Sequence, residues 1–233
     1  MKRLSLFILL LVLVSCGKET HDLTVKGTVK NLKKGTLYLK KQKDTTIVTV
    51  DSITVNGEPT FELHSNIESP EVFYLSLKEG DSENNSIEFF ADKGVTEINT
   101  TLKNFFADAK IVGSEQQKLW EDYKKVMARF NEKNLELIKE NLEAQQSGDT
   151  SQISRIQNEY DNNLKRRYLF TVNYAINNKD SELSPYLALS EIYNAQINLL
   201  DTINNSLTPK VKESKYGKEL QVFIDDIKSE ENQ

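Results

Sequence analysis

The hydrophobic pattern of this chain changes its period near Gly113. Upstream, residues 23–29 alternate apolar side chains with polar ones, and residues 47–55 are rich in threonine and β-branched side chains, both of which are typical of strands. Downstream, apolar side chains recur at steps of three and four, which places them on one face of a helix. The two periods predict an α+β protein, with a β-domain over residues 23–112 and a helical domain over residues 113–228.

Turn residues divide the β-domain into about eight short strands. Asn56-Gly57 supplies a turn able to hold positive φ between two of them, and Pro59 limits the next strand to a strand end or a sheet edge. Strands of this number and length are typical of a small antiparallel sandwich or a partly open barrel. The expected strands cover residues 23–29, 36–40, 47–55, 61–63, 72–77, 87–90, 95–101 and 107–112.

Two apolar stripes on either side of Gly148 predict a long helical hairpin over residues 114–178. Ser114 and Gln117 fit a capping box, in which the serine oxygen accepts from a backbone N–H and the glutamine reaches back to the cap residue. We interpret the stripes as core between helices and between helix and sheet, with a partner-binding groove as the alternative. They comprise Trp120, Tyr123, Met127, Phe130, Leu135, Ile138 and Leu142, then Ile153, Ile156, Tyr160, Leu164, Tyr168 and Val172.

Shorter helices are expected after the hairpin. Ser184-Pro185 and Thr208-Pro209 are typical helix starts, because proline is tolerated in the first turn. The last helix is predicted to end near Ile227, and residues 229–233 form a polar, frayed tail.

The first residues predict export and attachment of lipid. Two basic residues precede an apolar run of about eleven residues, which suits the core of a signal peptide and is too short to span a bilayer. The Ser15-Cys16 end of this run resembles the lipobox of bacterial lipoproteins. The resemblance implies a signal peptide over residues 1–15, cleavage between Ser15 and Cys16, acylation of Cys16 with chains such as palmitate, and a tether over residues 16–22.

Cys16 is the only cysteine in the 233 residues. The chain therefore forms no internal disulfide and carries no CxxC redox pair. Removal of residues 1–15 takes two of the 30 basic residues, so 28 remain against 35 acidic ones, a formal charge of −7. An acidic chain without a basic stripe is not expected to bind nucleic acid.

Residue types that carry catalysis or bind metals are sparse. His21 and His64 are scattered and cannot supply the three or four ligands of a zinc site, so we expect no metal and no other cofactor. The glycines occur singly, which excludes a phosphate-cradling loop. Carboxylates are plentiful, but they fall mostly on polar helix faces and in turns. The chain is therefore predicted not to be an enzyme, and a carboxylate-dependent hydrolase is the lowest alternative.

Short segments in both halves match a known arrangement. They are Lys26-Gly27-Thr28-Val29, residues 51–57, the strand at Phe61, residues 89–94, Val112-Gly113-Ser114 and residues 204–220. Together they resemble Bacteroidetes lipoproteins in which an uncharacterised β-domain and a helical segment precede a thioredoxin-like domain of the TlpA or AhpC type. That domain would begin about where this sequence stops, at Gln233. Without a CxxC pair, the reductase activity of the family is not expected here.

The same resemblance implies further features after the lipid. Gly17 follows Cys16, and the absence of aspartate at this position favours sorting to the outer membrane, either its periplasmic face or the cell surface. Three triplets beginning with aspartate look like the O-glycosylation motif of that phylum. The hydroxyls that would carry sugars are those of Thr45, Ser52 and Thr202.

These observations predict a non-catalytic lipoprotein of the cell envelope. Its partners would be the membrane, through the lipid on Cys16, and either another protein or a small ligand. An accessory subunit that docks a separate thioredoxin-like redox protein in the periplasm is the second reading.

Overall fold

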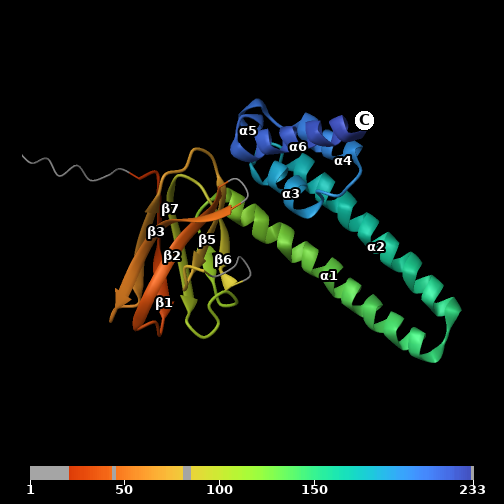
Figure 1. The fold of residues 1–233 in the computed structure, drawn as a ribbon, viewed down its shortest axis with the longest axis horizontal. Coiled ribbons are helices and arrows are strands. Elements are labelled where there is room, and N and C mark those ends of the chain that lie inside the picture. Colours follow the sequence, from red (N-terminus) through yellow and green to blue (C-terminus); the bar gives the residue numbers. More distant parts are fainter. Residues whose placement is uncertain (1–20, 44–45, 81–84, 232–233) are drawn as a thin grey trace, which may run out of the picture.

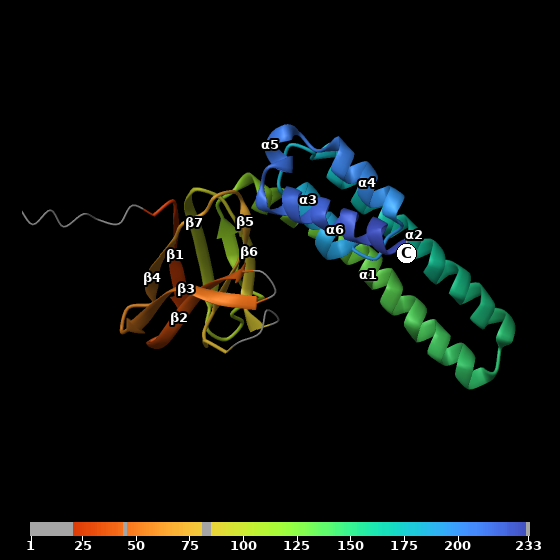
Figure 2. The same cartoon turned by 45° about the horizontal axis from the view of Figure 1, so that its top comes forward.

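The computed structural model describes residues 21–43, 46–80 and 85–231 (Figure 1). The predicted signal peptide and the lipidation residue Cys16 lie outside these residues. The described chain forms a β-sandwich from which a long helical hairpin projects. Shorter C-terminal helices pack beside the end of the hairpin that is nearer to the sandwich (Figures 1 and 2).

The strands of the described chain form two four-stranded sheets, with the orders β4-β1-β7-β8 and β3-β2-β5-β6. Apolar side chains from both sheets, among them Leu23, Leu39, Leu63, Phe73 and Ile98, are buried in one core. The strands are β1 (Leu23–Lys30), β2 (Lys34–Lys43), β3 (Thr46–Asn56), β4 (Thr60–Ser65), β5 (Glu71–Ser76), β6 (Ile87–Ala91), β7 (Gly94–Thr101) and β8 (Lys110–Val112).

This arrangement confirms the predicted α+β class and the sandwich, and the sheets are not closed into a barrel. Within the described residues, β1 and β7 run parallel while the other strand pairs are antiparallel. Parallel neighbours need a long connection between them, and here the chain passes through β2 to β6 between the two strands.

Two sequence features of the sandwich have clear structural roles. Strand β4 follows Pro59 and lies at the edge of its sheet, as expected. At Gly27, a Cβ atom would lie 1.8 Å from the carbonyl oxygen of Ile98 on the neighbouring strand. Only glycine fits there, because the contact is with backbone that cannot move aside independently.

The hairpin consists of two long helices, as the sequence predicted. Gly148 ends the first in a left-handed conformation (φ 70°), and the Asp149 side chain caps the second by accepting from the N–H of Gln152. The helices of the described chain are α1 (Glu115–Ser147), α2 (Thr150–Asn177), α3 (Leu183–Glu191), α4 (Ile197–Ser206), α5 (Pro209–Lys212) and α6 (Lys215–Glu231). Among the described residues, no helix has both the length and the apolar character needed to cross a membrane.

The C-terminal helices form a bundle with the end of α2. Val172, Leu200, Ile203, Leu220 and Ile224 are buried within it. Helix α6 continues through Glu231, past the predicted end near Ile227. Residues 229–231, which the sequence placed in a frayed tail, are therefore helical.

The distal part of the hairpin buries a different set of α1 side chains from the predicted one. Leu137 and Ala144 face Ile156 of α2 and are buried with it. Helix α1 carries two apolar stripes in this part, and α2 covers only one of them. The predicted residues form the uncovered stripe, in which Leu135 is 66%, Ile138 47% and Leu142 55% exposed.

Candidate functional site at the junction of sandwich and helices

Strand β5 is buried on both faces, because the helices cover the outer face of its sheet. Val72 and Tyr74 of β5 and Phe90 of β6 form a second core with helical side chains, including Trp120 of α1 and Tyr216 of α6. The Trp120 ring contacts the rings of Phe90 and Tyr186 edge to face, with centroid distances of 6.0 and 5.5 Å. This aromatic packing joins the two parts of the molecule.

The start of α1 is bonded to the free edge of β6. Ser114 Oγ donates to the carbonyl oxygen of Phe90 at 2.9 Å, and Gln117 Oε1 accepts from the Phe90 N–H at 2.8 Å. Ser114 also accepts from the N–H of Gln117, which confirms its role as the cap. The predicted capping box is half wrong, since Gln117 reaches the sheet and not the cap residue. The two side chains thereby satisfy the backbone N–H and C=O of Phe90, which would otherwise be exposed at the edge of the sheet.

The start of α6 is bonded to β5 in a similar way. The Tyr216 hydroxyl accepts from the buried N–H of Val72 at 3.0 Å. The neighbouring Lys215 ammonium lies 2.7 Å from Glu71, which is 5% exposed and also binds Lys41 at 2.8 Å. Burial raises the pKa of the Tyr216 hydroxyl, so it remains protonated at physiological pH.

A cleft of about 450 Å³ opens between the sandwich and α1. Its walls come from β6, β8, the loop before β8 and the first turns of α1. The side chains that give it chemical character are Glu88, Phe106, Lys110, Glu121 and Lys124. Phe106 is 61% exposed, so an aromatic surface is presented beside two lysines and two glutamates.

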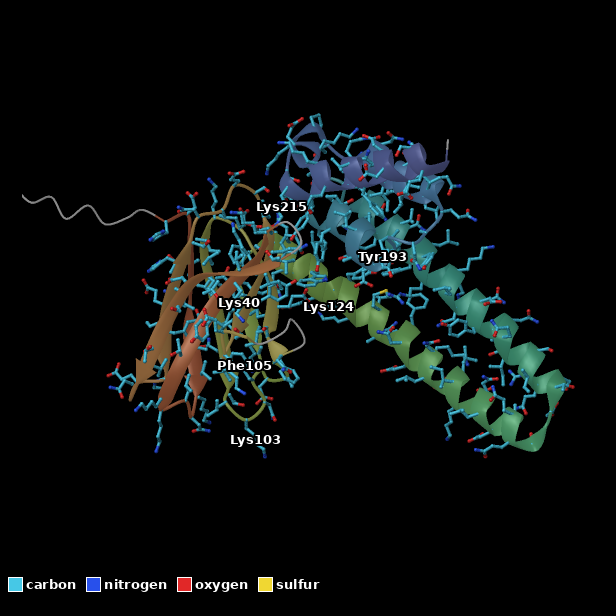
Figure 3. All side chains as sticks on the ribbon, in the orientation of Figure 1. Lys40, Lys103, Phe105, Lys124, Tyr193 and Lys215 are labelled. Carbon is cyan, nitrogen blue, oxygen red and sulfur yellow. The ribbon has the colours of Figure 1, made fainter. Side chains whose placement is uncertain are left out.

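The polar groups of the cleft have definite partners. Lys124 is exposed along much of its length, but its ammonium lies 3.8 Å from the centre of the Trp120 ring. Partial burial of the ammonium lowers the pKa of Lys124. The negative charges of Glu88 and Glu121 act in the opposite direction, but the effect of burial is larger. Glu88 accepts from the Tyr186 hydroxyl at 3.3 Å. Figure 3 shows Lys124 on the part of α1 nearest the sandwich.

Glu121 and Lys125 are four residues apart on α1, a spacing at which opposite charges can form a supportive pair, but each binds another residue. In the structure Glu121 accepts from Gln117 at 2.8 Å, and Lys125 binds Asp122 at 2.8 Å. Glu121 is thereby turned toward the sandwich, where it lines the cleft.

A larger and more open hollow of about 580 Å³ lies over the outer face of β4, β1 and β7. In its floor Lys26 is in register with Glu62 on one side and Glu97 on the other. These opposite charges lie side by side across the strands. No helix contributes a wall, so the cleft beside α1 is the better candidate for a binding site.

The site residues predicted from sequence are not brought together. Ser15, Cys16 and Thr45 lie outside the described residues. Ser52 is exposed on β3, and Thr202 is exposed on α4, where its hydroxyl donates to the Asn198 carbonyl at 2.6 Å. These last two residues come from the sandwich and from the C-terminal bundle, and neither lines the cleft.

His21 and His64 are closer than the sequence suggested, because β1 pairs with β4. Their rings stack with a centroid distance of 5.1 Å, and His64 lies 3.4 Å from Glu62 and 3.3 Å from the Thr24 hydroxyl. Within the ranges that the structure describes, no group of three or more His, Cys, Asp or Glu side chains could hold a metal ion.

The cleft itself was missed from the sequence. Its residues come from three separate segments of the chain. Within one segment, Trp120 and Lys124 are four residues apart, a spacing that suits a cation–π pair on a helix, and this was the one local sign of the cleft in the sequence. Glu88 and Lys110 belong to different sheets, and the packing of the two sheets that brings both residues to the cleft leaves no such trace.

Comparison with known families adds one finding. Residues 23–120 match a family model described as Domain of unknown function (DUF4369). The matched segment spans the sandwich and reaches Trp120, so it includes Ser114 and Gln117, which bond α1 to β6. This segment is similar to an uncharacterised domain, in agreement with the predicted uncharacterised β-domain. Searches of curated proteins and of solved structures return no match.

Proposed function

We propose that this chain is a non-catalytic binding lipoprotein of the cell envelope, held at a membrane by lipid on Cys16. The cleft between the sandwich and α1 is its binding site. The single observation that carries the proposed binding role is the cleft, with exposed Phe106 beside charged side chains of both signs.

The walls of the cleft are held in place before any partner arrives. Ser114 and Gln117 fix the start of α1 to the backbone of Phe90, and Tyr216 fixes α6 to the adjacent strand. A site that is already ordered loses less conformational entropy on binding. Its volume of about 450 Å³ is in the usual range for a small-ligand pocket, and it equally suits a short segment of another protein.

The carboxylates of the cleft favour binding over acid–base chemistry. Glu88 already accepts from Tyr186, and Glu121 already accepts from Gln117. A partner with an apolar side chain beside negatively charged groups would contact Phe106 with the first and the ammonium groups of Lys110 and Lys124 with the second.

Site-specific photo-crosslinking in intact cells tests this proposal. A photoreactive residue at Phe106 is expected to capture a defined partner, and the same residue at Tyr193, which is 58% exposed on another part of the surface, is not. The Lys110→Glu exchange should reduce capture from position 106. Equal labelling from both positions, or none from Phe106, would contradict the proposed site. Capture of a thioredoxin-like protein would favour the redox-accessory reading.

The anchor and its location need separate tests. Cys16→Ala should abolish incorporation of labelled palmitate and partitioning into detergent. Proteolysis of intact cells, with lysed cells as the control, distinguishes display on the cell surface from exposure to the periplasm. A Cys16→Ala protein that still carries palmitate would exclude lipidation at this residue.

A hydrolase remains the lowest alternative, and it is retained because Glu88 and Glu121 both line the cleft. Glycoside hydrolysis needs two carboxyl groups that flank the bond to be cleaved. Any hydrolytic activity of the purified protein that is lost in both Glu88→Gln and Glu121→Gln would replace the binding proposal.

A further inference from the structure

We propose that the distal half of the hairpin binds a second copy of this chain, so that two hairpins form a four-helix bundle. The surface involved, called the neutral face here, consists of Leu135, Ile138 and Leu142 of α1 with Gln157, Tyr160 and Leu164 of α2. It is separate from the cleft, and the inference does not depend on the proposed function. Figures 1 and 2 show this end of the hairpin extending beyond α3, α4 and α6.

The α1 part of the neutral face has the spacing of a helix-packing stripe. Leu135, Ile138 and Leu142 follow one another at steps of three and four, and they are 66%, 47% and 55% exposed. This is the spacing at which apolar residues form the seam between packed helices. Asn131 and Gln145 continue the same spacing at either end with uncharged side chains.

Both helices contribute to the same side of the hairpin. Ile138 of α1 and Gln157 and Tyr160 of α2 line a common cavity of about 170 Å³. Tyr160 also lines a second, smaller cavity with Leu164 and Asn134. The neutral face therefore has two hollows between its helices, which side chains of an opposing helix pair can enter, as in four-helix bundles.

The charged residues of this part of α1 lie on the other side. At about 100° per residue, each of the following residues lies at least about 100° around the helix from Ile138, and Lys139, four residues after Leu135, is the one nearest the exposed apolar stripe: Glu132, Lys133, Glu136, Lys139, Glu140 and Glu143. Some of them form ion pairs with α2, including Arg155 with Glu140 at 2.9 Å and Lys133 with Glu159 at 3.7 Å. The hairpin thus has one ionic side and one side with little charge. Lys139 and Asp161 lie at the border of the neutral face, and Arg167 lines its smaller cavity.

This distribution of charge selects a second copy as the occupant. The chain has a formal charge of −5, so two copies repel one another over most of their surfaces. On the neutral face that repulsion is smallest. Its polar residues are amides, and an amide offers both donors and acceptors, so it can pair with the same residue type across a two-fold axis. The scarcity of lysine and arginine on this face argues against a lipid surface, since interfacial helices carry them on their polar side.

The size of the face is sufficient for a specific but weak interface. Residues 131–146 of α1 extend about 24 Å, and two helices of about 10 Å diameter give a face of about 500 Å². Two copies would then bury about 1,000 Å², the lower bound for a specific complex. A contact of this size forms and dissociates readily, so covalent trapping is the suitable assay.

The test uses the full chain expressed in cells as two copies with different tags. A photoreactive residue replaces Leu142 on the neutral face, and in a matched chain it replaces Glu136. Glu136 lies about 160° around the helix from Ile138. The expected product from position 142 carries both tags and has twice the mass of one chain, whereas position 136 gives none.

Charge substitutions complete the test. Ile138→Lys should lower the yield of the two-tag product at least about tenfold, because it places like charges opposite one another in the interface. Glu136→Lys, the control on the ionic side, should leave it unchanged. Three results would each overturn the inference. They are a crosslinked product with another molecule, no product from position 142, and a two-tag product that persists in folded Ile138→Lys.

A second variant guards against misfolding. Ile138→Gln removes apolar area from the face without adding charge, and it should also lower the yield. The fluorescence of Trp120, the only tryptophan, reports whether each purified variant retains the junction between sandwich and helices. A native spectrum with undiminished yield in Ile138→Gln would count against the neutral face as the contact surface.

Discussion

Replacing Tyr216 by phenylalanine removes one hydroxyl group from the junction and leaves the aromatic ring in place. That hydroxyl accepts from the Val72 N–H at 3.0 Å, between residues 144 positions apart, and the contact is buried. In the variant the N–H has lost its acceptor and is still shielded from water. Leaving a buried donor unpaired destabilises a protein by about 1 to 3 kcal/mol. A loss of about 2 kcal/mol lowers the melting temperature of a chain of this size by about 4 to 8 °C.

The measurement is unfolding in urea and on heating, followed by circular dichroism and by Trp120 fluorescence. Tyr193→Phe is the matched control, because Tyr193 is 58% exposed and the same atom is removed from a solvated position. It should change the stability by less than about 0.5 kcal/mol. If Tyr216→Phe were as stable as the Tyr193→Phe control, the Tyr216 hydroxyl would not hold α6 to β5.

Three further changes test other contacts of the fold. Gln117→Leu should destabilise the protein by about 1 to 3 kcal/mol, because the buried N–H of Phe90 loses its acceptor; urea unfolding measures this. Glu71→Gln should destabilise it by roughly 3 kcal/mol in the same assay, since two lysines lose the carboxylate between them. Hydrogen bonds from the start of α2 hold the Asp149 pKa below its ordinary value of 3.8, so its stabilising effect is present above about pH 4 and is lost as the pH falls through the lowered pKa. The difference in helix content between the wild type and Asp149→Ala during thermal unfolding should therefore be larger at pH 7 than at pH 3.

Each of these has an outcome that would refute it. An unchanged urea midpoint in Gln117→Leu would mean that water or another group reaches the β6 edge. A fully stable Glu71→Gln would show that the two lysines need no counter-ion. A difference for Asp149→Ala that grows as the pH falls would reverse the sign derived from its lowered pKa.

The elements of this fold were predictable where the signal is local. Alternation along β1 and the stripes of the hairpin depend on side chains two to four residues apart, and the sequence shows both directly. The cap at Ser114 and the break at Gly148 are equally local, because each is decided within one turn of helix.

Contacts between distant segments were not predictable in this way. The sequence does not show which N–H at a strand end lacks a partner, so the bonds from Gln117 and Tyr216 to the sheet left no signal. Similarly, α1 carries two apolar stripes, and the choice between Leu137 and Ile138 as core depends on how α2 lies against it. Predicting the cleft would have required all of these contacts at once.

The bonding of α1 to β6 determines where this chain can be divided. A fragment that stops at Val112, the end of the last strand, would leave both backbone groups of Phe90 open and the rings of Tyr74 and Phe90 without their cover. An open edge beside an apolar face invites pairing between copies and aggregation. The period change at Gly113 therefore marks a change of secondary structure, not a place to cut. The smallest unit that keeps its own edge covered must extend into the first turns of α1, as the segment 23–120 does.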